Sequence, residues 1–159
     1  EFKRVLELYE AHKKDEVPEP PRRAIRPKDK VVSTMLSVTK QEGMEISNMV
    51  QSRVEEWAGV ELEPTYQYGF RNYKRGAILD IHRDTEDSHI IGVIINVAQQ
   101  VDNGWALNIE DNYDFKHEIY LSPQTMLFYE SRNLLHGRVL PLDGDNYVNM
   151  FLHFRPKEI

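Results

Sequence analysis

Apolar residues recur with two different periods along this chain, a helical period in the first third and a period of two afterwards. The helical spacing predicts a short amphipathic helix over residues 1–14 and a stronger helix between Gly43 and Gly59. The apolar face of the second helix consists of Ile46, Met49, Val50, Val54, Trp57 and Ala58. Between the helices, residues 17–27 hold four prolines, which exclude a regular helix or a central strand, and residues 31–38 predict a strand.

Beyond residue 64 the sequence predicts a series of short strands. Tyr66, Tyr68 and Phe70 alternate with polar or small residues, which is typical of a strand with one buried face. Residues 89–97 are almost continuously apolar, as expected of a strand that is buried on both faces. Turn residues separate the other predicted strands, which cover residues 105–109, 116–121, 125–129, 136–140 and 146–154. About eight strands behind a helical N-terminal part predict a mainly β, α+β fold, a double-stranded β-helix (jelly-roll or cupin-type barrel) with N-terminal helices packed on it.

The length of 159 residues suits a single domain, residues 1–159. We expect a helical N-terminal part over residues 1–60, with a proline- and arginine-rich segment at 17–30, and a jelly-roll core over residues 61–159. The sequence has no cysteine, which excludes disulfides and thiol nucleophiles and leaves the compartment open. No apolar stretch approaches the ~20 residues of a membrane helix, and no targeting segment is recognisable, so we expect a soluble protein without a membrane partner. The oligomeric state stays open.

The formal net charge of −6 makes a nucleic-acid partner unexpected, because such partners attract basic surfaces. One local exception is a basic run with a single acidic residue, which contains Arg22, Arg23, Arg26, Lys28, Asp29 and Lys30. A solvated linker is one interpretation of this run. The other is a docking strip for an acidic or extended substrate, and the segment at 17–30 could also be a lid over a site.

Two histidines and one aspartate form the most informative set of polar residues. His82 and Asp84 are one residue apart, so their side chains share one face of an extended segment. His136 follows in a later predicted strand, which a barrel can bring to the same interior face. Two imidazoles and one carboxylate form the facial triad that holds a non-haem Fe(II) ion and leaves coordination positions open. The sequence therefore predicts His82, Asp84 and His136 as catalytic metal ligands; in the alternative, a structural barrel, His82 and His136 never meet.

Several further motifs lie around these three residues. The first is Tyr73-Lys74-Arg75-Gly76, whose tyrosine stands nine residues ahead of His82. The others are Ile46-Ser47-Asn48-Met49-Val50, Asn103-Gly104-Trp105-Ala106-Leu107-Asn108, Ser122-Pro123-Gln124-Thr125-Met126-Leu127-Phe128 and Pro141-Leu142-Asp143-Gly144. Over residues 31–156 this arrangement resembles the 2-oxoglutarate- and Fe(II)-dependent dioxygenases, and within them the prolyl 4-hydroxylase-like branch.

The resemblance implies an oxidoreductase that hydroxylates an unactivated carbon and releases succinate and CO2. Fe(II), 2-oxoglutarate and O2 are the implied cofactors and co-substrates, with ascorbate as the expected reductant. The implied substrate is a peptide or protein that carries the target proline. Two alternatives stay open: the same chemistry on another substrate, such as a free amino acid or a modified nucleobase, or a catalytically inactive binding module that retains the metal.

The sequence departs from this family at two positions that would bind 2-oxoglutarate. The family has a lysine downstream of the distal histidine, where this chain has Asn146, which can hydrogen-bond the co-substrate but carries no charge. A threonine of the family, on the strand after the iron motif, corresponds to Gly92 here. Another cation is therefore needed for the far carboxylate of the co-substrate, or the co-substrate binds differently.

Arg138 is the predicted cation for that carboxylate. It lies two residues after His136 and so shares the inward face of that residue on a strand. Two other interpretations are that Arg138 is exposed, or that it pairs with Asp143 or Asp145. The fallback cation is then Arg155.

Other polar and aromatic residues have weaker indications. By its family position, Tyr73 is predicted to hydrogen-bond the co-substrate. Asn149 and Tyr129 could support the site from behind the ligands, and Trp105 could line the mouth of the barrel or belong to its core. No second set with metal-ligand spacing joins the remaining histidines, which we expect to be structural or exposed: His89, His117 and His153.

Overall fold

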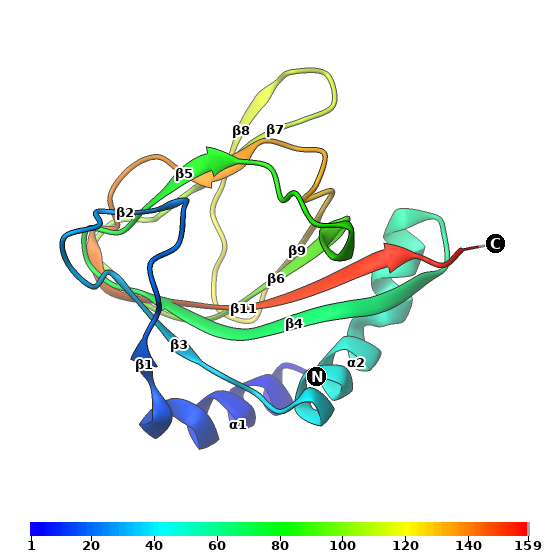
Figure 1. The fold of residues 1–159 in the computed structure, drawn as a ribbon, viewed down its shortest axis with the longest axis horizontal. Helices are drawn as coiled ribbons and strands as arrows, with labels where there is room; N and C mark the ends of the chain where they lie inside the picture. The colour runs from blue at the N-terminus through cyan, green and yellow to red at the C-terminus, as the bar shows by residue number, and fades with distance from the viewer. Residues whose placement is uncertain (159) are drawn as a thin grey trace.

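The computed structural model describes residues 1–158, which fold into two α-helices, two short 3-10 turns and eleven strands (Figure 1). In chain order they are α1 (Phe2–His12), η1 (Lys13–Asp15), β1 (Val17–Pro18), β2 (Ile25–Arg26), β3 (Ser33–Leu36), α2 (Lys40–Ala58), β4 (Leu62–Tyr73), β5 (Ile78–His82), η2 (Asp87–His89), β6 (Ile91–Val101), β7 (Leu107–Glu110), β8 (Lys116–Ile119), β9 (Met126–Tyr129), β10 (His136–Arg138) and β11 (Gly144–Pro156). Within these residues no helix combines the length and the apolar character needed to cross a membrane.

The strands form two antiparallel sheets that face each other (Figure 1). Residues of both sheets line a cavity. The larger sheet has the strand order β1-β3-β4-β11-β6-β9, and the smaller sheet has the order β2-β5-β10-β7-β8. Strands far apart in sequence thus lie side by side: β11 pairs with β4 and β6, and β10 pairs with β5 and β7. The prediction of a mainly β fold with two N-terminal helices is confirmed at this level. The sequence predicts seven of the strands β4 to β11 as strands, and the eighth, β5, only as an extended segment around His82.

Helix α2 begins earlier than the hydrophobic pattern predicts. The Thr39 side chain accepts a hydrogen bond from the backbone N–H of Glu42, and the Glu42 side chain accepts one from the N–H of Thr39. This reciprocal capping satisfies two N–H groups of the first turn and places Gly43 inside the helix rather than before it. Gly43 lies against β4, where a Cβ would come within 2.8 Å of the Gln67 Cβ. The helix ends as predicted at Gly59, whose left-handed conformation (φ 73°) closes it.

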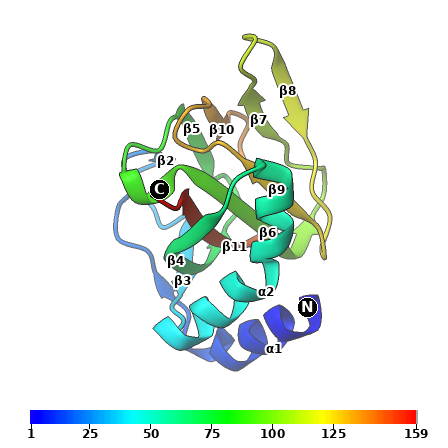
Figure 2. The same cartoon turned by 90° about the vertical axis from the view of Figure 1, so that its right-hand side faces the viewer.

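The larger sheet has an apolar face toward the helices and a more polar face toward the cavity. Strand β11 shows this division, because alternate residues of a strand point to opposite faces. One set packs in the core with α1 and α2 and consists of Val148, Met150, Leu152 and Phe154. The other set lines the cavity and contains Asn149, Phe151 and His153. The helices therefore cover the outer face of this sheet and leave the inner face free for a site (Figure 1, Figure 2).

Strand β4 changes face halfway along, which the sequence pattern does not predict. Tyr66 and Tyr68 line the cavity, whereas Phe70 is fully buried on the helix side. The expected common face of these aromatics is wrong because the register between β4 and β11 shifts next to Gly69, which has a φ of 95°. Such a bulge adds one residue to the strand and reverses the faces that follow it. Two more side chains of β4 thereby face the cavity, Arg71 and Tyr73.

Residues 19–26, called the strap below, cross from the larger sheet to the smaller one. β1 lies beside β3 at the edge of the larger sheet, and β2 lies beside β5 at the edge of the smaller sheet. Both are edge strands of two residues, which confirms that the prolines exclude a helix or a central strand here. The strap is the blue segment that joins the two sheets in Figure 1, so it forms one wall of the cavity.

Candidate active site

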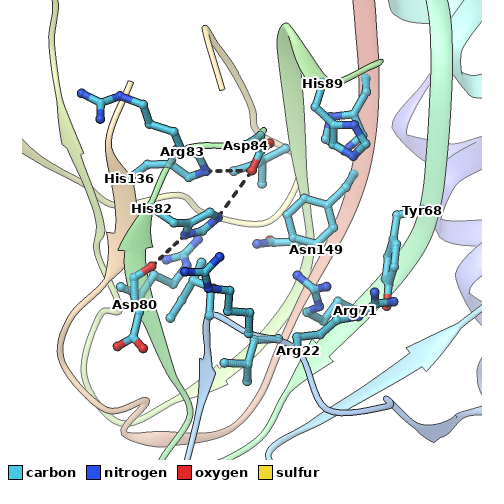
Figure 3. Close-up of a pocket in the computed structure, with 18 of the residues that line it drawn as sticks. Arg22, Tyr68, Arg71, Asp80, His82, Arg83, Asp84, His89, His136 and Asn149 are labelled. Carbon is cyan, nitrogen blue, oxygen red and sulfur yellow. Dashed lines mark hydrogen bonds and ion pairs between the residues drawn. The ribbon is translucent and has the colours of Figure 1, made fainter. Parts of the chain in front are cut away.

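A cavity of about 1020 Å³ lies between the two sheets. Strands β4, β6 and β11 line one side of it, and β5 and β10 line the other. Four strap residues line it as well: Arg22, Arg23, Ala24 and Ile25. The three predicted metal ligands all line this cavity (Figure 3).

The smaller sheet brings the three predicted ligands together. His82 ends β5, His136 begins β10, and the two residues are direct partners in the ladder between these strands. The centroids of their rings are 4.5 Å apart. The Asp84 Oδ1 atom lies 3.4 Å from His82 Nε2 and 3.7 Å from His136 Nε2. One donor atom from each residue lies within 4.8 Å of the other two, so the alternative in which the histidines never meet is wrong.

Backbone carbonyl groups hold both imidazoles in one orientation. His82 Nδ1 lies 2.7 Å from the carbonyl oxygen of Asp80, and His136 Nδ1 lies 2.9 Å from that of Leu134. A carbonyl oxygen can only accept a hydrogen bond, so each Nδ1 donates, and in the neutral imidazole each Nε2 keeps its lone pair. Both Nε2 atoms face Asp84 (Figure 3), which is how metal-ligating histidines are commonly oriented.

Burial and close packing change the pKa values of these three groups. Burial lowers the pKa of His136 below its usual value. Burial disfavours the charged form of His82, but the hydrogen bond and charge of Asp84 and the Asp80 carbonyl together outweigh this effect and raise the pKa. Burial alone would raise the pKa of Asp84, but the hydrogen bond from His82 and the charge of His136 lower it. Asp84 is therefore ionised at neutral pH, as a metal ligand must be.

The three residues fit a divalent transition metal ion. Two imidazole nitrogens and one carboxylate oxygen are the donor set of facial-triad Fe(II) sites. The His136 side chain is 4% exposed and the Asp84 side chain 19%, so this is not a solvated surface cluster. Because all three residues line the cavity, a ligand in the cavity can reach the coordination positions that they leave open.

Arg138 lies at the buried end of the cavity and is 1% exposed. Its Nη1 donates a 2.7 Å hydrogen bond to the carbonyl oxygen of Trp105, and its guanidinium lies 4.6 Å from the ring centroids of Trp105 and Tyr147. Trp105 itself belongs to the core, at 4% exposure, and not to the mouth. Nη2 of Arg138 has no hydrogen-bond partner within residues 1–158. A buried guanidinium without an anion is costly, so the carboxylate of a ligand would complete this site.

Two alternative interpretations of Arg138 are wrong, namely that it is exposed and that it pairs with a local aspartate. Arg138 is neither exposed nor paired with Asp143 or Asp145, because Arg75 forms ion pairs with both of those aspartates. The fallback residue, Arg155, does not line the cavity and pairs with a surface glutamate of β4.

Two asparagines of β11 differ in their relation to the cavity. Asn146 does not line it, since its Oδ1 accepts hydrogen bonds from Asn72 and Lys74 and its Nδ2 donates one to Gln100. Its geometry therefore offers no support for the predicted contact with the co-substrate. Asn149, in contrast, lines the cavity, and its Nδ2 has no partner within the described part of the chain.

Two tyrosines line the cavity near the triad and Arg138. The Tyr73 hydroxyl accepts a 3.3 Å hydrogen bond from Arg71 Nη1, which orients it. The Tyr129 ring packs edge-on against His136, with centroids 4.9 Å apart, and burial raises the pKa of its hydroxyl. Gly92 lies opposite Tyr129 in the ladder between β6 and β9, and a Cβ there would come within 2.7 Å of the Tyr129 ring. The absence of a side chain at Gly92 thus makes room for the Tyr129 ring.

A buried ion pair on the strap side has no counterpart among the sequence predictions. The Glu19 side chain is 0% exposed, and its carboxylate accepts hydrogen bonds from Arg71 Nε and Nη2 at 2.9 and 2.8 Å. Ser33, Tyr68 and Arg22 donate further hydrogen bonds to it. Burial alone would raise the pKa of Glu19, but the hydrogen bonds and charge of Arg71 lower it. No motif marks this pair, because the residues are distant in sequence and the bulge in β4 decides the face of Arg71.

Two of the histidines that we expected to be structural or exposed also line the cavity. The rings of His89 and His153 are 3.8 Å apart between centroids, and Tyr66 stacks beside them. Burial and the nearby His89 lower the pKa of His153 to about 3, so this ring is neutral. His117 is exposed as expected and pairs with Asp111 beside the β7–β8 hairpin, which projects from the body in Figure 2.

Comparison with known proteins places this fold in a class. No family model matches the sequence, and no curated protein matches it significantly. Solved structures of prolyl hydroxylases and of a 2-oxoglutarate/Fe(II) oxygenase nevertheless have the same fold. The likeness concerns the fold alone, because the sequences are only 13 to 17% identical.

Three of these structures illustrate the likeness. A prolyl-4-hydroxylase from Pseudomonas putida is 13% identical, with a TM-score of 0.65 over 99% of this chain and 89% of that one. An oxidoreductase of the 2-oxoglutarate/Fe(II) oxygenase family from Burkholderia pseudomallei is 13% identical, with a TM-score of 0.62 over 97% and 77%. A prolyl hydroxylase from Trichoplax adhaerens, in complex with a peptide fragment of the hypoxia inducible factor oxygen degradation domain, is 17% identical, with a TM-score of 0.66 over 96% and 75%.

Proposed function

We propose that this protein is an Fe(II)- and 2-oxoglutarate-dependent dioxygenase that hydroxylates an unactivated carbon. The observation that carries the proposal is the position of the His82–Asp84–His136 group in the same cavity as Arg138, a buried cation without an anion. A metal site and a carboxylate site in one cavity are what a chelating dicarboxylate co-substrate requires. We also infer that the two sheets form a double-stranded β-helix, since the structures with the same fold are oxygenases.

In this proposal the protein holds and orients the reacting groups. His82 Nε2, His136 Nε2 and the Asp84 carboxylate hold the Fe(II) ion, and the two backbone carbonyls keep the imidazoles aimed at it. When bound, Fe(II) supplies the activation of O2, which converts 2-oxoglutarate to succinate and CO2 and leaves one oxygen atom for the hydroxylation of the substrate. The apolar and aromatic residues among those that line the cavity, such as Ile94, Leu107 and Phe151, exclude water and aim the substrate carbon.

The co-substrate lies, in this proposal, between the triad and Arg138. The free Nη2 of Arg138 binds its distal carboxylate. The hydroxyls of Tyr73 and Tyr129 and the amide of Asn149 are the other polar groups that could hydrogen-bond it, since all three residues line the cavity. This assignment makes Arg138 the replacement for the charge that is absent at Asn146.

We propose a proline in a peptide as the target. Two of the three structures described above are named prolyl hydroxylases, and one of them contains a bound peptide fragment. The strap and the Tyr66, His89 and His153 rings give the cavity a mouth with apolar and aromatic contact surface for such a chain. Another substrate for the same chemistry is the alternative that the experiment below can separate.

The test is the release of succinate from 2-oxoglutarate in the presence of Fe(II), ascorbate and O2, with and without a proline-rich peptide. The expected result is succinate formation that the peptide stimulates, together with hydroxyproline in the peptide by mass spectrometry. Slow succinate release that the peptide does not stimulate would support the dioxygenase activity and show that this peptide is not its substrate. If the protein binds iron and no succinate forms, it is a metal-retaining binding module. His136→Ala is the matched control for iron in solution.

A further inference from the structure

The cavity collects positive charge in a protein that is acidic as a whole. The chain has a formal net charge of −6. Five arginines nevertheless line the cavity, namely Arg22, Arg23, Arg71, Arg83 and Arg138, against three acidic residues, Asp80, Asp84 and Glu86. A cavity of one sign attracts ligands of the opposite sign and raises their local concentration. A charge that has no partner within the protein is the one available to such a ligand.

Most of the cavity arginines have an identified contact. Arg71 is bound by Glu19, and Arg22 donates hydrogen bonds to Glu19 and to the Tyr68 hydroxyl, on the side of the cavity that Figure 3 shows away from His136. Arg138 lies at the buried end, and Arg83 Nε donates a hydrogen bond to the backbone of the loop before β10. The side chain of Arg23 has no partner within residues 1–158.

The acidic residues of the cavity are also engaged. Asp80 pairs with Arg26, and Glu86 lies 3.2 Å from His89 Nδ1. Asp84 is committed to the metal-ligand group. No carboxylate of the cavity is therefore left to neutralise Arg23, and its charge remains available to a ligand.

The strap presents Arg23 from a fixed position. Before it, the buried Glu19 carboxylate ties the strap to the larger sheet. After it, Ile25 and Arg26 pair with β5, the Ala24 carbonyl accepts a 2.7 Å hydrogen bond from the Asp80 N–H, and Ile25 N–H closes a turn onto the Arg22 carbonyl. The turn that carries Arg23 is thus anchored at both ends, on the strand that leads to His82. A fixed strap is part of the binding wall, and it holds the backbone of Arg23 in place while the exposed side chain stays free to reach a ligand.

We propose that Arg23 binds an acidic side chain of the substrate, so that the substrate is an acidic peptide segment next to the target residue. This inference rests on the proposed function for the identity of the target. A carboxylate accepts the paired N–H groups of a guanidinium, which gives the contact direction as well as charge. Arg83, on the loop after β5, adds to the field without a carboxylate partner of its own. The rest of the basic run, from Lys28 to Lys30, does not line the cavity.

The experiment measures peptide binding to the protein loaded with Mn(II) and 2-oxoglutarate, by fluorescence anisotropy. Three labelled peptides share one length and one central proline and differ only in flanking residues, which are glutamate, glutamine or lysine. The expected order of affinity is glutamate, then glutamine, then lysine. Arg23→Gln is expected to weaken the glutamate peptide by about 3- to 10-fold, the range of a partly solvated charge contact, and to leave the glutamine peptide unchanged.

Lys40→Gln is the matched control, because it removes one positive charge at an exposed position on α2, outside the cavity. This variant is expected to bind all three peptides as the wild type does. The inference is overturned if the peptides bind equally or not at all, if Arg23→Gln weakens the glutamate and glutamine peptides alike, or if a single-stranded oligonucleotide of the same charge binds more tightly than the glutamate peptide.

Binding and turnover fail separately in this design. If affinity follows peptide charge and loses this dependence in Arg23→Gln while no succinate is released, the recognition of acidic peptides by Arg23 is supported and the dioxygenase activity is contradicted. If succinate is released and all three peptides bind with the same affinity, the dioxygenase activity is supported and the role of Arg23 is contradicted.

Discussion

Two arginines in the same cavity differ in what surrounds them. Arg71, on the strap side, pairs with the buried Glu19, and each of its three guanidinium nitrogens has a partner. Arg138, at the buried end, has one backbone carbonyl as a partner and no carboxylate among residues 1–158. Both lie against aromatic rings. A buried charge with all its partners is part of the fold, whereas one without an anion marks a place for a ligand.

The two asparagines of β11 repeat this contrast. Asn146 takes the family position of the co-substrate lysine, but its amide group is fully engaged with neighbours outside the cavity. Asn149 lines the cavity and has an Nδ2 without a partner in the described chain. We therefore expect a ligand in the cavity to contact Arg138 and Asn149, which line it and have unsatisfied polar atoms, and not Asn146.

The largest expected effect is at the triad. Asp84→Ala or His136→Ala should weaken Mn(II) or Fe(II) binding by about 1000-fold or more, because metal sites of this kind share on the order of 10 kcal/mol among a few ligands. Turnover should be lost while the circular dichroism and thermal unfolding stay close to those of the wild type. Calorimetric titration of the metal measures the effect. Asp80→Ala is the control, since its backbone carbonyl still holds His82; full metal affinity in the Asp84 variant would refute the assignment.

Arg71→Met tests the structural arginine of the comparison. It should lower the free energy of unfolding by about 3–5 kcal/mol, because it leaves the buried Glu19 carboxylate without its main partner. Arg75→Met is the control, since Arg75 is exposed and forms its ion pairs at the surface, and it should cost less than about 1 kcal/mol. Urea unfolding of the metal-free proteins measures both. Equal stability of the Arg71 variant and the wild type would contradict the assignment of Arg71 as the arginine that stabilises the fold, in contrast to Arg138.

Arg138→Ala tests the ligand-binding arginine. It should raise the 2-oxoglutarate requirement by one to several orders of magnitude, in line with the about 2–5 kcal/mol lost when a buried charge pair is broken. Arg138→Met, which fills the space, should lower the free energy of unfolding of the metal-free protein by only about 1–3 kcal/mol, because the Trp105 carbonyl loses a hydrogen bond but no anion loses its partner. Titration of 2-oxoglutarate into the Mn(II)-loaded proteins measures the affinity. Asn146→Ala is the control and should bind 2-oxoglutarate with the affinity of the wild type. An unchanged affinity in the Arg138 variants would assign the carboxylate to another residue.

The smallest expected effect is a pH dependence of stability from Glu19. Its folded-state pKa is lowered from the ordinary 4.5, so it stabilises the fold at pH values above 4.5 and loses this contribution as the pH falls through the lowered value. Wild-type stability should therefore fall more steeply on acidification than that of Glu19→Gln, which has no such group to protonate. Urea midpoints between pH 3 and 7 are compared. Parallel curves for the two proteins would show that Glu19 is not the group responsible.

Much of the fold follows from local patterns in the sequence. Both helices and all strands beyond residue 64 except β5 lie close to where the apolar periods predict them, because each element has to bury one face. The His82–Asp84 pair could also be predicted, since the two residues share parity, whereas the approach of His136 follows only from the expected barrel, in which the ladder between β5 and β10 pairs it with His82. The start of α2 differs because the capping box at Thr39 and Glu42 outweighs the helix-breaking tendency of Gly43.

The sequence by itself determined the type of most elements, the apolar core under the larger sheet and the common face of His82 and Asp84, because these depend on spacing along one segment. The approach of His136 to these two residues depends on the ladder between β5 and β10. The tertiary structure alone decided which charged residues are paired. The shifted register at Gly69 turns Arg71 toward Glu19, and Gly92 makes room for Tyr129. Whether a buried arginine has an anion depends on contacts between segments far apart in the chain, and no local pattern records them.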